Sequence, residues 1–171
     1  MDMGEIDYTK ELKEILSIPD KSLSQEEFRG WIDKSETMIC ERFETHDRHS
    51  SIGAGFQLEQ AVTPGIYTRE LTMTAGSLVF SKIHMETHPF VILSGKVAVY
   101  DGGKIEILEA PYKGVTVAGT KRVLFVHEET KWITFHPTSL TDLQEIDKNC
   151  VITCDTFDEF EASKNNRSIE Q

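Results

Sequence analysis

Residues 76–95 read GSLVFSKIHMETHPFVILSG, and this stretch contains two apolar runs between two glycines. The runs SLVFSKIH and FVILSG contain many β-branched and aromatic residues, which favour strands over helices. Two histidines, His84 and His88, stand between the most apolar parts of the runs at a spacing of four residues. The stretch therefore predicts two short strands with imidazole groups where they meet.

The same strand-like pattern extends on both sides of this stretch, from about Gly55 to His136. Runs such as GIYTRELTM, KVAVY, KIEILEA, GVTVAG, RVLFVH and KWITFH are separated by short turns. The segment YDGGKIEI predicts a hairpin, because Asp101, Gly102 and Gly103 tolerate the positive φ angles of a tight turn. Short strands without helical patterns between them indicate a sandwich or closed barrel, such as a double-sheet jelly roll.

The first fifty residues have a helical pattern instead. Ser24 and Glu27 fit a capping box, and a stripe recurs at helical spacing through residues 26–43. The stripe consists of Phe28, Trp31, Ile32, Ser35, Ile39 and Phe43. We expect it to pack on the barrel, with a dimer surface formed by Phe28, Trp31 and Phe43 as the alternative. The expected organisation is a helical extension at 1–50, a barrel at 51–140, and a helix, a strand and an acidic tail at 141–171.

Composition and charge exclude several classes of partner. The chain has 171 residues, 39% of them hydrophobic, which is enough for one core. A net charge of −11 disfavours nucleic acid, since binding to a phosphate backbone depends on clustered Lys and Arg. The amino terminus has no apolar signal segment, and no apolar run of about eighteen residues occurs. We therefore expect a soluble, cytoplasmic protein without nucleic-acid or membrane partners.

The spacing of three glycines resembles the cupin family of small jelly-roll barrels. The first cupin motif has Gly, His, His, Glu and Gly in order, and it begins here at Gly76 and ends at Gly95. The second motif is matched at Gly119. The chain is particularly similar to compact single-domain cupin-like proteins of tailed bacteriophages and bacteria. The resemblance covers about residues 63–137 and implies an all-β core, a cupin-like jelly-roll barrel with an α-helical N-terminal extension.

The resemblance also implies a site inside the barrel, although its residue types differ from those of a metal cupin. The four ligand positions fall on Lys82, His84, His88 and Arg122, and only His84 keeps the residue type of the motif. Charged Lys and Arg have no free lone pair, so Lys82 and Arg122 would repel a cation. The site therefore favours a small polar or anionic ligand, such as a carboxylate, a phosphate or a sugar acid.

Two alternatives remain open for the histidines. His84 and His88, joined by Glu86 or His127, form a donor set for a divalent metal such as Fe, Mn, Ni or Zn. They could instead be core residues that are hydrogen-bonded to neighbouring strands. His136, which ends a strand before Pro137, is expected to serve as a strand-end hydrogen-bonding residue.

Two hypotheses on function follow from the resemblance. The first is a protein that binds a small polar or anionic molecule in its barrel, with or without a divalent metal. If it is an enzyme, the resemblance allows a dioxygenase, isomerase, epimerase or lyase, with Glu86 or His127 as general base. The second is a non-catalytic accessory or structural protein, phage-encoded and located in the host cytoplasm, that acts through its surface and N-terminal helices. A homodimer is expected in either case.

Overall fold

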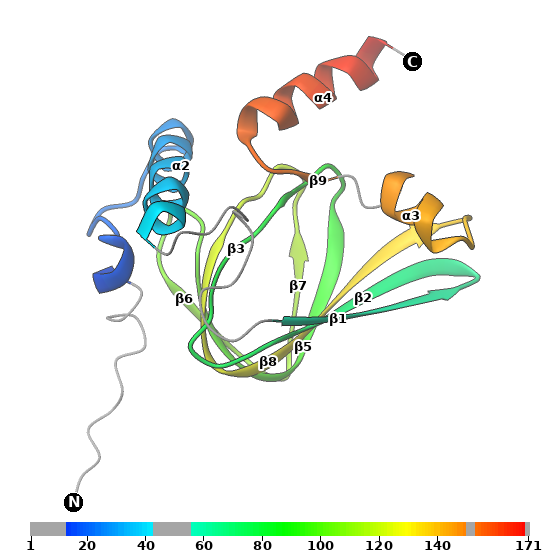
Figure 1. Cartoon of the computed structure of the whole chain (residues 1–171), viewed down its shortest axis with the longest axis horizontal. Coiled ribbons are helices and arrows are strands. Elements are labelled where there is room, and N and C mark those ends of the chain that lie inside the picture. The colour runs from blue at the N-terminus through cyan, green and yellow to red at the C-terminus, as the bar shows by residue number, and fades with distance from the viewer. Residues whose placement is uncertain (1–12, 43–55, 150–152, 170–171) are drawn as a thin grey trace, which may run out of the picture.

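The computed structural model describes residues 13–42, 56–149 and 153–169, and its centre is a curved antiparallel sheet (Figure 1). Its strands are β1 (Phe56–Thr63), β2 (Gly65–Met73), β3 (Leu78–Phe80), β5 (His88–Tyr100), β6 (Glu106–Glu109), β7 (Tyr112–Thr116) and β8 (Val123–Thr138). Strand β4 (Ile83–His84) lies outside this sheet and pairs with a short C-terminal strand in a separate two-stranded sheet. Helix α2 (Gln25–Arg42) precedes them, and α3 (Leu143–Asn149), β9 (Thr153–Cys154) and α4 (Phe157–Ile169) follow. The predicted all-β core with a helical N-terminal extension is confirmed.

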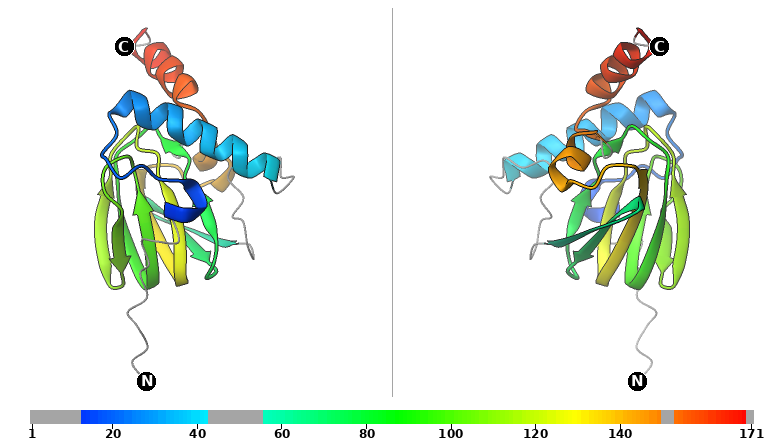
Figure 2. Two further views of the ribbon diagram at one scale, coloured as in Figure 1. Left: turned by 90° about the vertical axis from the view of Figure 1, so that its left-hand side faces the viewer. Right: turned by 90° about the vertical axis from the view of Figure 1, so that its right-hand side faces the viewer.

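Strands β5 and β8 form the middle of the sheet and run along both of its halves. At one end β8 pairs with β2 and β5 with β7, and at the other end β8 pairs with β3 and β5 with β6. Their pairing shifts register between Ile92 and Val97. Gly95 lies at this bend with φ of 93°, and a Cβ there would collide with the carbonyl oxygen of Glu129. The bend lets the sheet curl around an interior (Figure 2).

The bend also explains where the strands differ from the predicted runs. The runs FVILSG and KVAVY belong to the single strand β5, and RVLFVH and KWITFH belong to β8. Glu128 and Glu129 look like a turn in the sequence, but they are exposed residues at the bulge of a continuous strand. The predicted hairpin is confirmed, with Val99 of β5 paired with Glu106 of β6.

Two apolar clusters lie on opposite faces of the sheet. The interior cluster consists of Met73, Val79, Phe90, Ile92, Val97, Val99, Leu108, Leu124, Val126 and Trp132. The other cluster joins the outer face of β5 and β8 to α2 and α4, and it includes Tyr100, Val123, Phe28, Ile32 and Phe160. Leu124 and Val126 contribute to the interior cluster while Phe125 between them packs against the outer one, as strand alternation requires.

Helix α2 begins at the predicted capping box and packs on the outer cluster. The amide of Glu27 donates to Ser24 Oγ at 3.2 Å, and the amide of Ser24 donates to Glu27 Oε2 at 2.8 Å. Phe28 is buried, and the rings of Phe28 and Trp31 meet the edge or face of Tyr100 at centroid distances of 5.7 and 5.2 Å. Phe28 and Trp31 therefore pack on the barrel, as expected. The alternative of a dimer surface stays a prediction, and Phe43 lies outside the described residues.

The C-terminal part contains one more helix than the sequence pattern predicted. The expected short helix and strand correspond to α3 and β9, but the expected acidic tail forms α4 from Phe157 onward. Thr156 and Glu159 cap its first turn, since the amide of Glu159 donates to Thr156 Oγ1 at 3.2 Å and the amide of Thr156 to Glu159 Oε2 at 3.3 Å. Within the described residues, no helix has the length and apolar character that crossing a membrane requires.

The turn between β5 and β6 provides a stability prediction. Gly102 has φ of 100°, and a Cβ there would lie 2.8 Å from the ring of Phe28 on α2. We expect Gly102→Ala to lower the free energy of unfolding by about 1–3 kcal/mol through backbone strain alone, with the contact adding to it. Gly103→Ala is the control, because its nearest neighbour would lie at 3.5 Å. Equal midpoints of urea unfolding for the two variants would contradict the prediction.

Candidate functional site

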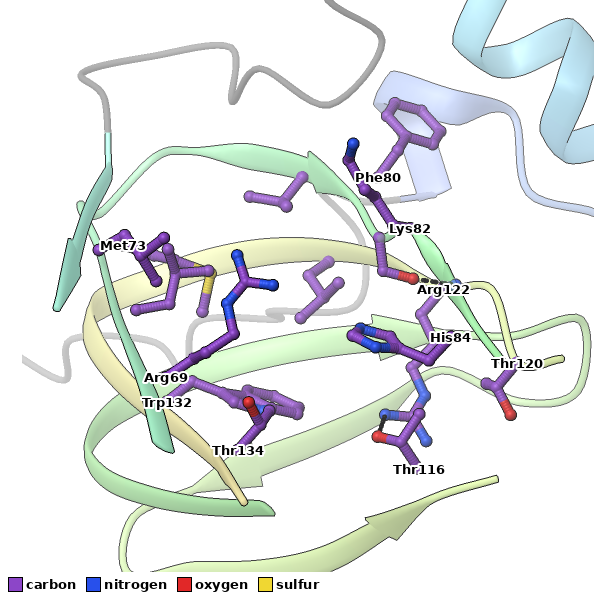
Figure 3. A pocket seen from close by; sticks show the side chains of 15 residues that line it. Arg69, Met73, Phe80, Lys82, His84, Thr116, Thr120, Arg122, Trp132 and Thr134 are labelled. Carbon is purple, nitrogen blue, oxygen red and sulfur yellow. Dashed lines mark hydrogen bonds between the residues drawn. The ribbon is translucent and has the colours of Figure 1, made fainter. Parts of the chain in front are cut away.

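The curled sheet encloses a cavity of about 260 Å³ (Figure 3). Its polar and charged lining residues are Arg69, Ser81, Lys82, His84, Thr116, Thr120, Arg122 and Thr134. Its apolar lining residues are Leu58, Leu71, Met73, Val79, Phe80, Leu124 and Trp132. The described lining contains no Asp or Glu, so every charged side chain of the cavity is cationic.

Arg122, which was predicted as a ligand-binding residue, is held in place by neighbouring elements. It stands just before β8; its amide donates to Ser81 Oγ at 2.9 Å, and its Nη1 donates to Thr116 Oγ1 at 3.2 Å. The guanidinium carbon lies 5.7 Å from the ring centre of Phe90. Burial lowers the pKa of Arg122 from its ordinary value. The guanidinium is thus partly desolvated, which strengthens its attraction for an anion.

Lys82 lines the cavity, but its side chain is largely exposed. Lys82 follows the end of β3, and its Nζ lies 3.5 Å from Asp155 Oδ1. Its side chain is 46% exposed, so this ion pair is screened by water. The sequence predicted Lys82 inside the barrel together with His84 and Arg122. The structure places it at the mouth, because the chain leaves the strand after Phe80.

His84 and His88 meet in the interior, and His136 of β8 joins them. The ring centroids lie 4.4 Å apart for His84 and His88, 4.6 Å for His88 and His136, and 6.0 Å for His84 and His136. Strand register explains the cluster: His136 pairs with Tyr67 of β2 on one side, and His88 pairs with Thr116 of β7 on the other. Strands β4, β5 and β8 thus bring three imidazoles together.

The three histidines are held neutral by their surroundings. Burial lowers the pKa of His84 to about 3 and that of His136 to about 4, and it also lowers the pKa of His88. Positive charge on Arg69 and Arg122 lowers the pKa of His84 further. His88 Nδ1 lies 3.1 Å from the carbonyl oxygen of Glu86, an acceptor, so the neutral ring carries its proton on Nδ1. His84, the member of the cluster that lines the cavity, therefore presents a dipole rather than a charge to it.

Of the metal set of His84, His88, Glu86 and His127, only His84 and His88 lie together. Glu86 is exposed in the segment between β4 and β5. His127 packs edge-on against Phe125 at 4.9 Å, on the outer side of β8. Among the described residues, no group of three or more His, Cys, Asp or Glu is arranged to hold a metal ion. With two arginines facing the histidines as well, the donor set does not fit a divalent metal.

Sequence reasoning missed two residues of this site, Arg69 and His136. Arg69 lies on β2, where it pairs in register with Thr134 of β8, another cavity residue. In the view of Figure 3 the ring of His84 lies between the side chains of Arg69 and Arg122. The one sequence signal for Arg69 was the alternation of side chains along a strand, which places Arg69 on the same face of β2 as Tyr67 and Leu71. This alternation could not have shown that the face lines a cavity.

His136 makes the expected hydrogen bond near a strand end, with Nε2 3.0 Å from Thr134 Oγ1.

Comparisons with known proteins bear on the fold. No family model matches the chain, and no curated protein matches it either. Among solved structures it resembles a cupin superfamily protein from Desulfitobacterium hafniense, with 12% identity and a TM-score of 0.42 over 49% of this chain and 81% of that one. It also resembles KdgF from Halomonas sp. (16%, TM-score 0.43, 54% and 90% of the two chains) and an acetylacetone dioxygenase from Acinetobacter johnsonii (19%, 0.44, 61% and 73%).

These likenesses concern the fold of roughly half of this chain. A cupin superfamily protein is among the solved structures that the chain resembles. The expected similarity to bacteriophage proteins is not tested by these comparisons.

Proposed function

We propose that the protein binds a small anionic molecule in the cavity of its barrel. The observation that supports this is the charge of the lining: Arg69, Lys82 and Arg122 are cationic, and the described lining has no carboxylate. In a chain with a net charge of −11, this is a local reversal of sign. A buried or half-buried guanidinium binds a carboxylate or a phosphate through two parallel hydrogen bonds.

The size and preparation of the cavity are in keeping with a small ligand. A volume of about 260 Å³ lies just below the range of about 300–1,000 Å³ that is usual for drug-sized molecules. Arg122 is already fixed by Thr116, by Ser81 and by the ring of Phe90. Binding therefore requires little additional ordering of this side chain, which favours affinity.

The proposal concerns binding and names no reaction, because a fold by itself does not determine chemistry. The other hypothesis, an accessory or structural protein acting through its surface and N-terminal helices, has less support from the described part of α2, since Phe28 and Trp31 pack against Tyr100.

The proposal is tested by thermal unfolding in sodium phosphate, acetate, succinate or phenylacetate, with sodium chloride of equal ionic strength as the reference. We expect at least one of these anions to raise Tm, since a ligand at a hundred times its Kd stabilises the fold by about 2.7 kcal/mol. The rise should disappear in the double variant Arg69→Gln, Arg122→Gln.

The matched control is Lys34→Gln, Lys113→Gln, which removes two positive charges from exposed positions on α2 and β7. It should keep the whole rise in Tm. The proposal fails if no anion raises Tm above the chloride reference, or if the rise is as large without Arg69 and Arg122 as with them.

A further inference from the structure

The cavity has a cationic side and a larger apolar side, and the two meet on β2 and β8. Arg69 is followed on the same face of β2 by Leu71 and Met73, and Thr134 on β8 is preceded by Trp132. Leu71 and Trp132 are register partners, two residues along the ladder from Arg69 and Thr134 and therefore on the same face. A ligand that contacts Arg69 therefore extends along an apolar wall.

The apolar wall is rigid and flat at Trp132. Its ring stacks on that of Phe90 at a centroid distance of 4.2 Å and an interplanar angle of 16°. Phe90 in turn lies over Gly114 of β7, where a Cβ would come within 2.6 Å of the ring. This stack leaves Trp132 little freedom to move, so it is a prepared surface for the ring of a ligand.

The two arginines of the cavity differ in what already engages them. Arg122 donates to Thr116 and lies near the face of Phe90. Asp101 and Glu106, which border a second, smaller cavity on the far side of Arg122, also act on its charge. The side chain of Arg69, by contrast, forms no hydrogen bond or ion pair with the residues that the structure describes, although Arg69 is half-buried. Arg69 is thus the guanidinium whose bonding capacity is least used.

We propose that the cavity takes an organic anion with a single carboxylate on an apolar ring, the carboxylate bound by Arg69 and the ring lying against Leu71, Met73 and Trp132. This inference rests on the proposed function and names its ligand class. A second carboxylate suits the cavity less well, because Arg122 already donates to Thr116 and is acted on by the charges of Asp101 and Glu106. Lys82, the third cation of the lining, is paired with Asp155 at the mouth.

The ligand class is tested by isothermal titration of the full chain with four probes. Phenylacetate has both the charge and the ring, acetate has the charge alone, 2-phenylethanol has the ring alone, and succinate has two charges and no ring. We expect phenylacetate to bind at least tenfold more tightly than each of the other three. Removing either half of the ligand removes one of the two contacts that the cavity offers.

The outcomes separate this inference from the proposed function. If acetate or succinate binds as tightly as phenylacetate, the ring contact is absent and this inference is overturned, while anion binding stands. If 2-phenylethanol binds as tightly as phenylacetate, or if none of the four binds, this inference is overturned, and the proposed function falls with it unless phosphate raises Tm above the chloride reference.

The role of Arg69 is tested with variants in the same titration. We expect Arg69→Gln to weaken phenylacetate binding at least tenfold, and Arg122→Gln to weaken it less. Arg69→Lys, which keeps the charge but loses the two-pronged geometry, should fall between wild type and Arg69→Gln. If Arg69→Gln does not fold, the Arg69→Lys variant tests the role of Arg69 in its place. Lys113→Gln, on the outer side of β7, is the control and should bind as wild type. A larger loss from Arg122→Gln than from Arg69→Gln would overturn the assignment of the carboxylate to Arg69.

Discussion

Replacement of Glu36 by Gln is expected to lower the free energy of unfolding by about 3–5 kcal/mol, because it leaves the charge of Lys121 buried without compensation. Glu36 Oε2 lies 2.6 Å from Lys121 Nζ, and both side chains are 0% exposed. Lys121 Nζ also donates to the carbonyl oxygen of Asp155 at 2.8 Å. This ion pair joins α2 to the segment before β8 and to the chain that follows β9, so its loss affects all three.

The measurement is urea unfolding of Glu36→Gln, Lys121→Met and the double variant Glu36→Leu, Lys121→Met. The double variant should be more stable than either single variant, since it leaves no buried charge unpaired. Asp20→Asn is the control, because it removes an ion pair with Lys13 in which Asp20 is 94% exposed, and such a pair contributes about 0–1 kcal/mol. If the single variants lose no more than Asp20→Asn, the pair does not have the stabilising role that its burial indicates.

The second large effect is the dependence of stability on pH. In the folded protein the pKa of His84 is lowered to about 3 and that of His136 to about 4, from an ordinary value of 6.5. Between those values and 6.5 the unfolded chain binds protons that the folded chain does not. The stabilisation is therefore complete above pH 6.5 and is lost as the pH falls toward the folded-state values. Each such histidine contributes up to about 1.4 kcal/mol per pH unit to the slope.

The measurement is denaturant unfolding at pH 7.5, 6.5, 5.5 and 5.0 with a chelator present, above the range in which most carboxylates titrate. The variants His84→Gln and His136→Gln should each reduce the slope by up to about 1.4 kcal/mol per pH unit. The positive charges of Arg69 and Arg122 disfavour a proton on His84 in the folded protein. They therefore act in the same direction as burial, so that stability falls as the pH falls. An unchanged slope in both variants would show that these histidines are not the source of the pH dependence.

Much of the fold could be predicted from local patterns. The capping box of Ser24 and Glu27 determined where α2 begins, because both hydrogen bonds are made within one turn. The hairpin at Gly102 was predictable for the same reason, since the conformation of its turn is set by the residues within it. Helix α4 was missed although Thr156 and Glu159 carry the same type of cap, because its polar composition outweighed that signal.

The candidate site was predicted in part. The glycine spacing led to His84, His88 and Arg122, which the structure places in or beside one cavity, and to Lys82, which it places at the mouth. Arg69 and His136 could not be found in this way, because the cupin motifs do not include β2 or the end of β8. Strand alternation gives the face of a residue, but only the register between strands shows which faces meet.

The sequence by itself determined the strand-rich class of fold, the start of α2 and the hairpin, because each is indicated by residue types and spacings that are local in the chain. Tertiary structure alone decided that Arg69 and Arg122 line one cavity, that His136 joins His84 and His88, and that Lys121 pairs with Glu36 across 85 residues. These contacts depend on the bend of β5 and β8 and on their pairing with β2 and β7. Such long-range geometry results from the packing of the whole chain, and no local pattern contains it.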